Sequence, residues 1–444
     1  LMTGVFRWRR VAVMVTGLTL MAGVGACDGL APPDQDPWLG GVSREGPAAA
    51  WTVQVATGGH QVAVLGDVVV VTDEGTLLGL DLTTGRERWR RDVTGEYRIS
   101  VAGGLVAQQT TDGPLEVVDP ATGATRWRDD RPGWRHVVRQ EAVYADDCAV
   151  RREAEQPGCV VEARALADGA VRWTLPATVS GVRDDRIGTR EPVAPASGKY
   201  LLAGIGDRGA PFGAVDTRTG RPLKGRIGVR GWYAFVVGDV LVSTDHDPPR
   251  GDRRCTVTVT GVAAADGAAR WSGAIYSGRR ADNECAKTLA DRENGAALIG
   301  TGSRVAAVTE GGRPQLVDLA TGDTVWTADG PGAPIDGYGT ALLVRQFADQ
   351  GPFRLLDVES GRERWTVPDT GLPGTSASWA SAVTGGLVAV SGATGDRPFV
   401  LVHEVDSGKQ LGRFPSWLAG AGDDWVAVTR GTGVRELTLE FVRF

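Results

Sequence analysis

The acidic, cysteine and histidine side chains of this 444-residue chain are its first candidates for chemistry. Asp245, Asp247 and Asp252 form the densest acidic cluster, but they lack the spacing of a calcium-binding loop, so we interpret them as a solvated loop. The four histidines are scattered and no CxxC motif occurs, which argues against a zinc site. GxSxG, HExxH and Walker-type glycine motifs are also absent. The sequence therefore predicts a protein that is not an enzyme and that uses no metal or cofactor.

Four cysteines in the body of the chain favour disulfides. Cys148, Cys159, Cys255 and Cys285 are an even number in a chain that we expect to be exported, and their order suggests the pairs 148–159 and 255–285. The first pair brackets "AVRREAEQPG" between two strand-like runs, so a bridge there would close a hairpin loop and stabilise it by about 3 kcal/mol. Free thiols and metal ligands are the alternatives, and the connectivity stays open.

The N-terminus has the features of an export signal. Arg7, Arg9 and Arg10 precede the apolar run 11–24, which is too short to span a bilayer comfortably. The run ends in "VGAC", which resembles the lipobox of bacterial lipoproteins, and this resemblance implies cleavage before Cys27 and lipid attachment to it. The alternative is an ordinary signal peptide with a chance cysteine. We therefore expect a signal peptide at 1–26, a flexible tether at 27–49 that is rich in Pro, Gly and Ala, and a folded body at 50–444.

The body contains a repeat built on one glycine per unit. Eight copies of a motif such as "LDLTTGRERW" occur at intervals of 38 to 55 residues, the size of one four-stranded propeller blade. The glycines are Gly85, Gly123, Gly169, Gly220, Gly267, Gly322, Gly361 and Gly408. Six copies carry a tryptophan four residues later: Trp89, Trp127, Trp173, Trp271, Trp326 and Trp365. Because six identical active sites are implausible, we interpret each motif as a structural joint, in which glycine makes the tight turn and tryptophan packs on the next blade.

This motif resembles the tryptophan-docking motif of the quinoprotein-type, PQQ-like β-propeller repeats. The resemblance covers the chain from about residue 51 and implies an all-β propeller of four-stranded antiparallel blades, A to D from the channel outward. The family includes quinone-dependent alcohol dehydrogenases and the propeller lipoprotein of the outer-membrane β-barrel assembly machinery. Dehydrogenases of the family use an adjacent cysteine pair and a metal site of Glu, Asn and Asp. This chain has no adjacent cysteines and only two asparagines, so we expect no bound quinone.

The ends of the body are expected to close the ring. "AWTVQV" (50–55) has the character of an outer strand, whereas the C-terminal stretch supplies inner strands only. The first strand would then complete the last blade and remove the free sheet edges. A literal count of repeats gives nine blades, but we favour eight because eight is commoner in the family.

Four long insertions mark one face of the predicted propeller. They are 151–158, 176–191, 245–254 and 272–294, and they fall at B–C or D–A connections, which share a face. Trp134, Trp232, Trp379 and Trp417 lie at or before predicted inner strands and form a candidate partner surface, with core packing as the alternative.

These features favour a lipid-anchored, monomeric scaffold on the extracytoplasmic face of the cell membrane that binds an envelope protein. The membrane would be contacted through the lipid alone. A formal net charge of -6 argues against nucleic acid as a partner. The alternatives are a sensor that binds a small molecule or glycan at the channel mouth, or a quinone-dependent dehydrogenase.

Overall fold

The computed structural model divides the chain into two compact units, Leu1–Gly40 and Gly41–Phe444, and the described residues all belong to the second unit. These are 43–56, 60–93, 95, 97–110, 113–130, 135–148, 159–177, 182, 193–194, 197–204, 212–228, 233–250, 254–279, 303–309, 312–345, 352–367, 375–394, 397–431 and 437–444. The predicted signal peptide and Cys27 lie outside them. No helix in these ranges has the length and apolar character needed to cross a membrane.

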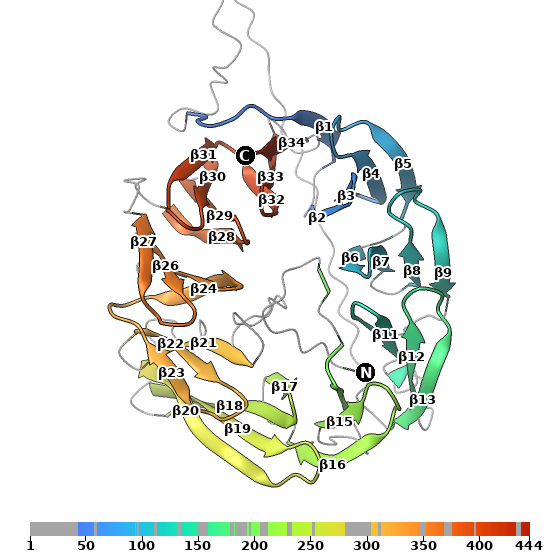
Figure 1. Ribbon diagram of the computed structural model, residues 1–444, viewed down its shortest axis with the longest axis vertical. Helices are drawn as coiled ribbons and strands as arrows, with labels where there is room; N and C mark the ends of the chain where they lie inside the picture. Colours follow the sequence, from blue (N-terminus) through green and yellow to red (C-terminus); the bar gives the residue numbers. More distant parts are fainter. Residues whose placement is uncertain are drawn as a thin grey trace, which may run out of the picture. The chain divides into compact units, whose positions relative to one another are not determined.

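The second unit is an all-β ring of nine antiparallel sheets, which we number as blades in chain order (Figure 1). Nine is the number that the literal repeat count gives, rather than the eight that family frequency favoured. Seven of the sheets have four strands, and blades 4 and 6 have three within the described residues. In each four-stranded blade except the last, the chain runs from the inner to the outer strand.

The strand bounds of the first four blades are as follows. Blade 1 has β2 (Val62–Leu65), β3 (Val68–Asp73), β4 (Thr76–Asp81) and β5 (Glu87–Asp92). Blade 2 has β6 (Tyr97–Ala102), β7 (Leu105–Thr110), β8 (Leu115–Val118) and β9 (Thr125–Asp129). Blade 3 has β10 (Arg135–Val138), β11 (Ala142–Asp146), β12 (Cys159–Ala165) and β13 (Val171–Ala177). Blade 4 has β14 (Tyr200–Gly204), β15 (Phe212–Asp216) and β16 (Pro222–Ile227).

The remaining blades complete the ring. Blade 5 has β17 (Tyr233–Val237), β18 (Val240–Arg250), β19 (Arg254–Ala263) and β20 (Ala269–Arg279). Blade 6 has β21 (Arg304–Val308), β22 (Pro314–Asp318) and β23 (Thr324–Thr327). Blade 7 has β24 (Ala333–Tyr338), β25 (Ala341–Arg345), β26 (Phe353–Asp357) and β27 (Glu363–Val367), and blade 8 has β28 (Thr375–Val383), β29 (Leu387–Thr394), β30 (Arg397–Glu404) and β31 (Gln410–Phe414). Blade 9 has β32 (Trp417–Ala421), β33 (Trp425–Gly431) and β34 (Leu437–Arg443), joined by β1 (Trp51–Val55).

The sequence of each strand matches its depth in the blade. Strand β3, "VVVVTD", is almost entirely buried, as expected for a middle strand covered on both faces by neighbouring blades. The outer strand β5, "ERWRRD", alternates exposed charged residues with the buried Trp89. β-branched residues fill the middle strands because they pack well on a pleated surface, and charges keep the outer edge from pairing with other chains.

The N-terminal strand closes the ring as the sequence predicts. Strand β1 pairs antiparallel with β34 over five residues, from Trp51 opposite Phe441 to Val55 opposite Leu437. In Figure 1 the blue β1 lies beside the red β34. The contact begins before β1, because Glu45 and Arg413 exchange two backbone hydrogen bonds. The sequence predicts a flexible tether up to residue 49, but Glu45, in its described part, pairs with blade 8.

We expect Trp51→Ala to destabilise the ring more than any exposed substitution in β1. The Trp51 ring is buried, stacks on Phe441 at 4.8 Å between centroids, and donates a hydrogen bond to the Leu82 carbonyl of blade 1 at 2.9 Å. Loss of a buried tryptophan costs about 3–5 kcal/mol. Urea unfolding of residues 41–444 would measure it, with the exposed neighbour substitution Thr52→Ala as control. Equal stabilities of the two variants would contradict closure through this strand.

Candidate functional site: the blade joints and the insertion-bearing face

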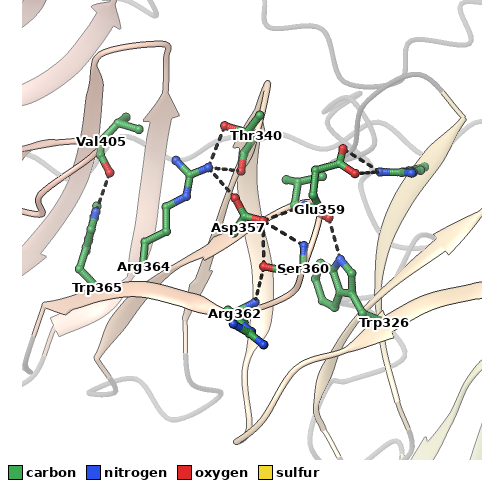
Figure 2. Close-up of polar contacts among 11 residues, drawn as sticks. Trp326, Thr340, Asp357, Glu359, Ser360, Arg362, Arg364, Trp365 and Val405 are labelled. Atoms are coloured by element: carbon green, nitrogen blue, oxygen red, sulfur yellow. Dashed lines mark hydrogen bonds and ion pairs between the residues drawn. The ribbon is translucent and has the colours of Figure 1, made fainter.

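The turn between the third and fourth strands is built around one aspartate, and blade 7 shows it clearly (Figure 2). Asp357 accepts hydrogen bonds from the backbone N–H groups of Glu359 and Ser360 at 3.1 and 2.9 Å and from the Ser360 hydroxyl at 2.9 Å. Its second oxygen accepts from Arg364 at 2.8 Å, and this bond lowers the pKa of the Asp357 carboxyl. Arg364 also donates to the Thr340 carbonyl and hydroxyl at 2.9 and 2.8 Å. One arginine therefore ties the A–B turn to the C–D turn of its own blade.

Blade 1 repeats this arrangement with different partners. Asp81 accepts from Arg88, Thr84 and Thr83, and the bonds from Arg88 and Thr84 lower the pKa of its carboxyl. Arg88 also donates to Asp67 in the A–B turn at 2.7 Å. The arginine that precedes the motif tryptophan thus has a structural task. In both blades, charged groups on the short-turn face pair within their own blade.

Each motif tryptophan lies flat on the motif glycine of the following blade. Trp326 covers Gly361 so closely that a Cβ on the glycine would lie 2.6 Å from the indole ring. Gly361 has φ of 68°, which the turn requires and which other residues rarely adopt. The pairs are Trp51–Gly85, Trp89–Gly123, Trp127–Gly169, Trp173–Gly220, Trp271–Gly322, Trp326–Gly361 and Trp365–Gly408. Trp51, from the closing strand β1, is the seventh such ring.

The indole N–H of these rings bonds a fixed carbonyl of the next blade. Trp326 donates to Val358 and Trp365 donates to Val405, both at 2.7 Å (Figure 2). The acceptor is always three residues before the glycine, in six joints: Leu82, Pro120, Leu166, Thr217, Val358 and Val405. Apolar contact and one hydrogen bond therefore lock adjacent blades in register.

Both joints of blade 5 depart from this pattern. At the joint with blade 4 the tryptophan position is Lys224, and the backbone N–H of Gly225 donates to the Ala264 carbonyl at 2.9 Å, which takes the place of an indole bond. A Cβ on Gly225 would overlap the Ala263 carbonyl oxygen, so glycine permits this approach. At the joint with blade 6, Trp271 stacks on Gly322, but its indole N–H is buried without a partner among the described residues.

The insertion-bearing face is braced in blade 3. Cys148 and Cys159 form a disulfide, as predicted, at the base of segment 151–158. Asp146 is fully buried and accepts from the backbone N–H groups of Cys148 at 3.1 Å and Val182 at 3.0 Å. The buried carboxylate therefore joins the B–C hairpin of blade 3 to the segment that leads into blade 4.

The chain between blades 3 and 4 contacts both neighbouring sheets. Val182, within the second insertion, bridges Ala203 of β14, whereas Val193, beyond the insertion, bridges Val101 of β6 in parallel. Ala194 is buried, donates its N–H to the Val101 carbonyl at 2.8 Å and accepts from the Gln140 side chain in the A–B turn of blade 3. This part of the chain therefore lies beside the A–B turns of blades 2 and 3.

Two predicted loops are instead long strands. Residues 245–250 continue β18 and residues 272–279 continue β20, so the acidic cluster Asp245 and Asp247 lies in a ladder rather than a solvated loop. Strands β18, β19 and β20 have 11, 10 and 11 residues, against nine for β28, the longest described strand elsewhere. Asp252 and Cys285 lie outside the described residues. The predicted pair Cys255–Cys285 stays a prediction.

The candidate partner tryptophans lie where inner strands begin. Trp417 is the first residue of β32 and Trp379 lies within β28. Trp134 and Trp232 lie outside the described residues, directly before β10 and β17. Their role as a partner surface stays a prediction.

Within the described ranges, the one grouping of side chains that could ligate a metal ion is Asp147, Cys148 and Cys159, and both sulfurs form the disulfide. Asp147 accepts from the Val160 N–H at 2.7 Å. The chain has no adjacent cysteine pair for a quinone, and Asn283 and Asn294 lie outside the described residues.

A buried histidine lies in the joint between blades 7 and 8. The His403 ring stacks on Trp365 at 5.8 Å between centroids, and its Nδ1 lies 3.0 Å from the Gly408 carbonyl oxygen. The opposite nitrogen, Nε2, is buried without a partner among the described residues. Burial lowers the pKa of His403, because an added proton on Nε2 would place an unpaired charge in the joint.

We expect Gly123→Ala to be far more destabilising than Gly104→Ala. Both glycines have similar φ, 70° and 75°, so both variants incur the same backbone strain of about 1–2 kcal/mol. Only at Gly123 would the new Cβ lie 2.7 Å from Trp89, whereas nothing lies within 4 Å at Gly104. Chemical unfolding of the two variants measures the difference. Equal losses would show that the indole plate contributes nothing at this joint.

The free energy of unfolding should fall with pH below about 6.5, the ordinary histidine value, and part of that fall should come from His403. Its folded-state pKa is lowered, so its contribution is intact above the unfolded value and is lost as pH falls toward the folded one. His403→Leu should remove this part, as measured by urea unfolding between pH 7.5 and 5. Identical pH slopes for wild type and variant would contradict the assignment.

No curated protein matches the chain. Solved structures similar to it include BamB from Moraxella catarrhalis (13% identity, 90% of this chain and 100% of that one, TM-score 0.42). The designed Ika8 protein (14%, 90% and 99%, 0.46) and a europium-containing methanol dehydrogenase (14%, 87% and 85%, 0.41) are further examples. A family model described as "Outer membrane protein assembly factor BamB" matches residues 35–253 and 236–367, three quarters of the chain, which therefore belongs to this family of PQQ-like repeat propellers.

Proposed function

We propose that this protein is a non-catalytic scaffold that binds an envelope protein through the insertion-bearing face of its propeller. The observation that carries the proposal is a difference in the length of the strand connections on the two faces of the propeller. In the blades whose inner strand is described, the A–B and C–D connections are short turns, as in blade 7, where only Gly339 and Thr340 separate β24 from β25. Segments 151–158, 245–254 and 272–294 fall at B–C or D–A connections on the opposite face. The second insertion is the exception, because Val182 bridges β14 and the chain after it is therefore the A–B connection of blade 4.

On the short-turn face, charged side chains of blades 1 and 7 are paired within their own blade. On the opposite face, the Cys148–Cys159 disulfide and the buried Asp146 hold the bases of two insertions. Loops that a rigid scaffold presents in this way are the usual carriers of binding function.

The non-catalytic part of the proposal rests on the residues of the chain. The sequence contains no GxSxG or HExxH motif and no adjacent cysteine pair, and both sulfurs of the one metal-ligand grouping among the described residues form a disulfide. The family name, that of an outer-membrane assembly factor, supports a role in binding other proteins. We further propose attachment through lipid on Cys27, which would keep the propeller on the extracytoplasmic face of the membrane.

Crosslinking from single positions in native membranes tests this function. We expect photo-crosslinkers placed in segments 151–158 and 245–254 to capture one discrete protein. The matched controls are Arg86 and Arg362, exposed residues next to motif glycines on the short-turn face, which should capture none. Cys27→Ala should release the protein from membranes. Capture from the control positions alone, or from none while the protein remains anchored, would overturn the proposal.

A further inference from the structure

Blade 5 carries a projecting ladder that distinguishes it from the other blades. The inner strand β17 pairs with β18 only as far as Thr244, yet β18, β19 and β20 continue pairing for several residues beyond that point. The extension consists of 245–250, 254–258 and 274–279, which we call the blade 5 ladder. It lies at the B–C and D–A end of the blade, the end that carries the insertions.

The register of this ladder places three arginines in one row at its tip. Arg250 is the cross-strand partner of Arg254, and Arg254 is the partner of Arg279. Directly opposed residues of antiparallel strands belong to the same face of the sheet, with about 4.5–5.5 Å between Cα atoms. Like charges in such positions destabilise a sheet. An anionic partner that binds all three arginines would offset this repulsion.

We propose that this row, Arg250, Arg254 and Arg279, binds an acidic segment of the partner protein. The inference rests on the proposed scaffold function and names the chemistry of the contact. Guanidinium groups bind carboxylates through two parallel hydrogen bonds, so three of them in a row can hold successive carboxylates of an extended acidic peptide. The row has one arginine from each of three neighbouring strands, so a single extended peptide that crosses the tip can contact all three.

The same geometry disfavours an anionic membrane as the occupant. Asp247 belongs to the same ladder, opposite Thr256, which is the partner of Ser277 and lies two positions after Arg254. An acidic carboxylate so near the tip would repel a continuous anionic surface, whereas a peptide need contact only the row itself.

The joints around blade 5 give independent support. One joint uses main-chain bonds of Gly225 where others use an indole, and the other leaves the Trp271 N–H unpaired among the described residues. In a ring of repeated units, the blade whose joints and strand lengths both deviate is the one adapted to a separate purpose.

The test uses the purified full chain and a fluorescent deca-glutamate peptide as the probe, with binding followed by anisotropy at low salt. The triple variant Arg250→Glu, Arg254→Glu, Arg279→Glu should weaken binding at least tenfold. The control triple Arg86→Glu, Arg172→Glu, Arg362→Glu makes the same change in net charge at exposed positions of blades 1, 3 and 7, and should weaken it less than threefold. Replacement of the row by lysines should give an intermediate loss, because lysine keeps the charge but not the paired hydrogen bonds.

Equal weakening by both triples would show a general field effect and overturn the proposal, as would unchanged binding in the row variant. Stronger row-dependent binding to phosphatidylglycerol vesicles than to the peptide would also overturn it, in favour of a lipid contact. Because the assay needs no native partner, it can succeed when membrane crosslinking captures nothing, and it can fail when crosslinking from other insertions succeeds. The failure of one proposal is therefore distinguishable from the failure of the other.

Discussion

The contact between an indole plate and a glycine turn is the interaction on which the ring depends. It joins the outer strand of one blade to the C–D turn of the next, and it requires both partners at once. A side chain on the glycine would overlap the ring, and a smaller residue in place of tryptophan would leave the turn uncovered. The carbonyl three residues before the glycine takes the indole N–H, so the contact also fixes how far one blade is displaced against its neighbour. Blade number, strand order and the placement of insertions all follow from repeating this joint.

The way the ring closes explains where a tryptophan is missing. Blade 9 takes its outer strand from β1, so it has no C–D turn and no docking glycine. A tryptophan at the end of blade 8 would have nothing to cover, and Gly412 stands at that position. The N-terminal segment fills the space instead, because Glu45 pairs with Arg413 and Arg44 lies over Phe414 while it forms an ion pair with the buried Glu440. Blade 8 therefore lacks the motif tryptophan because blade 9 has no docking glycine for it to cover.

The repeat made the fold predictable from the sequence, whereas the exceptions to the repeat could not be predicted. Eight glycines at blade spacing sufficed for the architecture, for closure through residues 50–55 and for nine as the literal count, because turn chemistry is local and written in every copy. The pairing of Cys148 with Cys159 was predictable for the same reason, since both flank one hairpin. The sequence analysis interpreted the ladder of blade 5 as loops because "DHDPPRGDRR" contains turn residues. The strands extend there because β18 pairs with β19 and β19 pairs with β20, and not because of local sequence preference. In the sequence, the only sign of main-chain docking at Gly225 is the lysine at the position of the motif tryptophan.

Departures from the repeat carry more functional information than the repeat itself. A joint that recurs seven times is explained by packing, and it would be the same whatever the protein binds. The repeat does not account for blade 5, whose strands are longer and whose register opposes arginines at a local cost in stability. Such a cost persists when the surrounding structure supports it, and here eight further blades with mostly standard joints provide that support. The proposed acidic partner would offset this cost, which is why we propose recognition at the blade that fits the repeat least well.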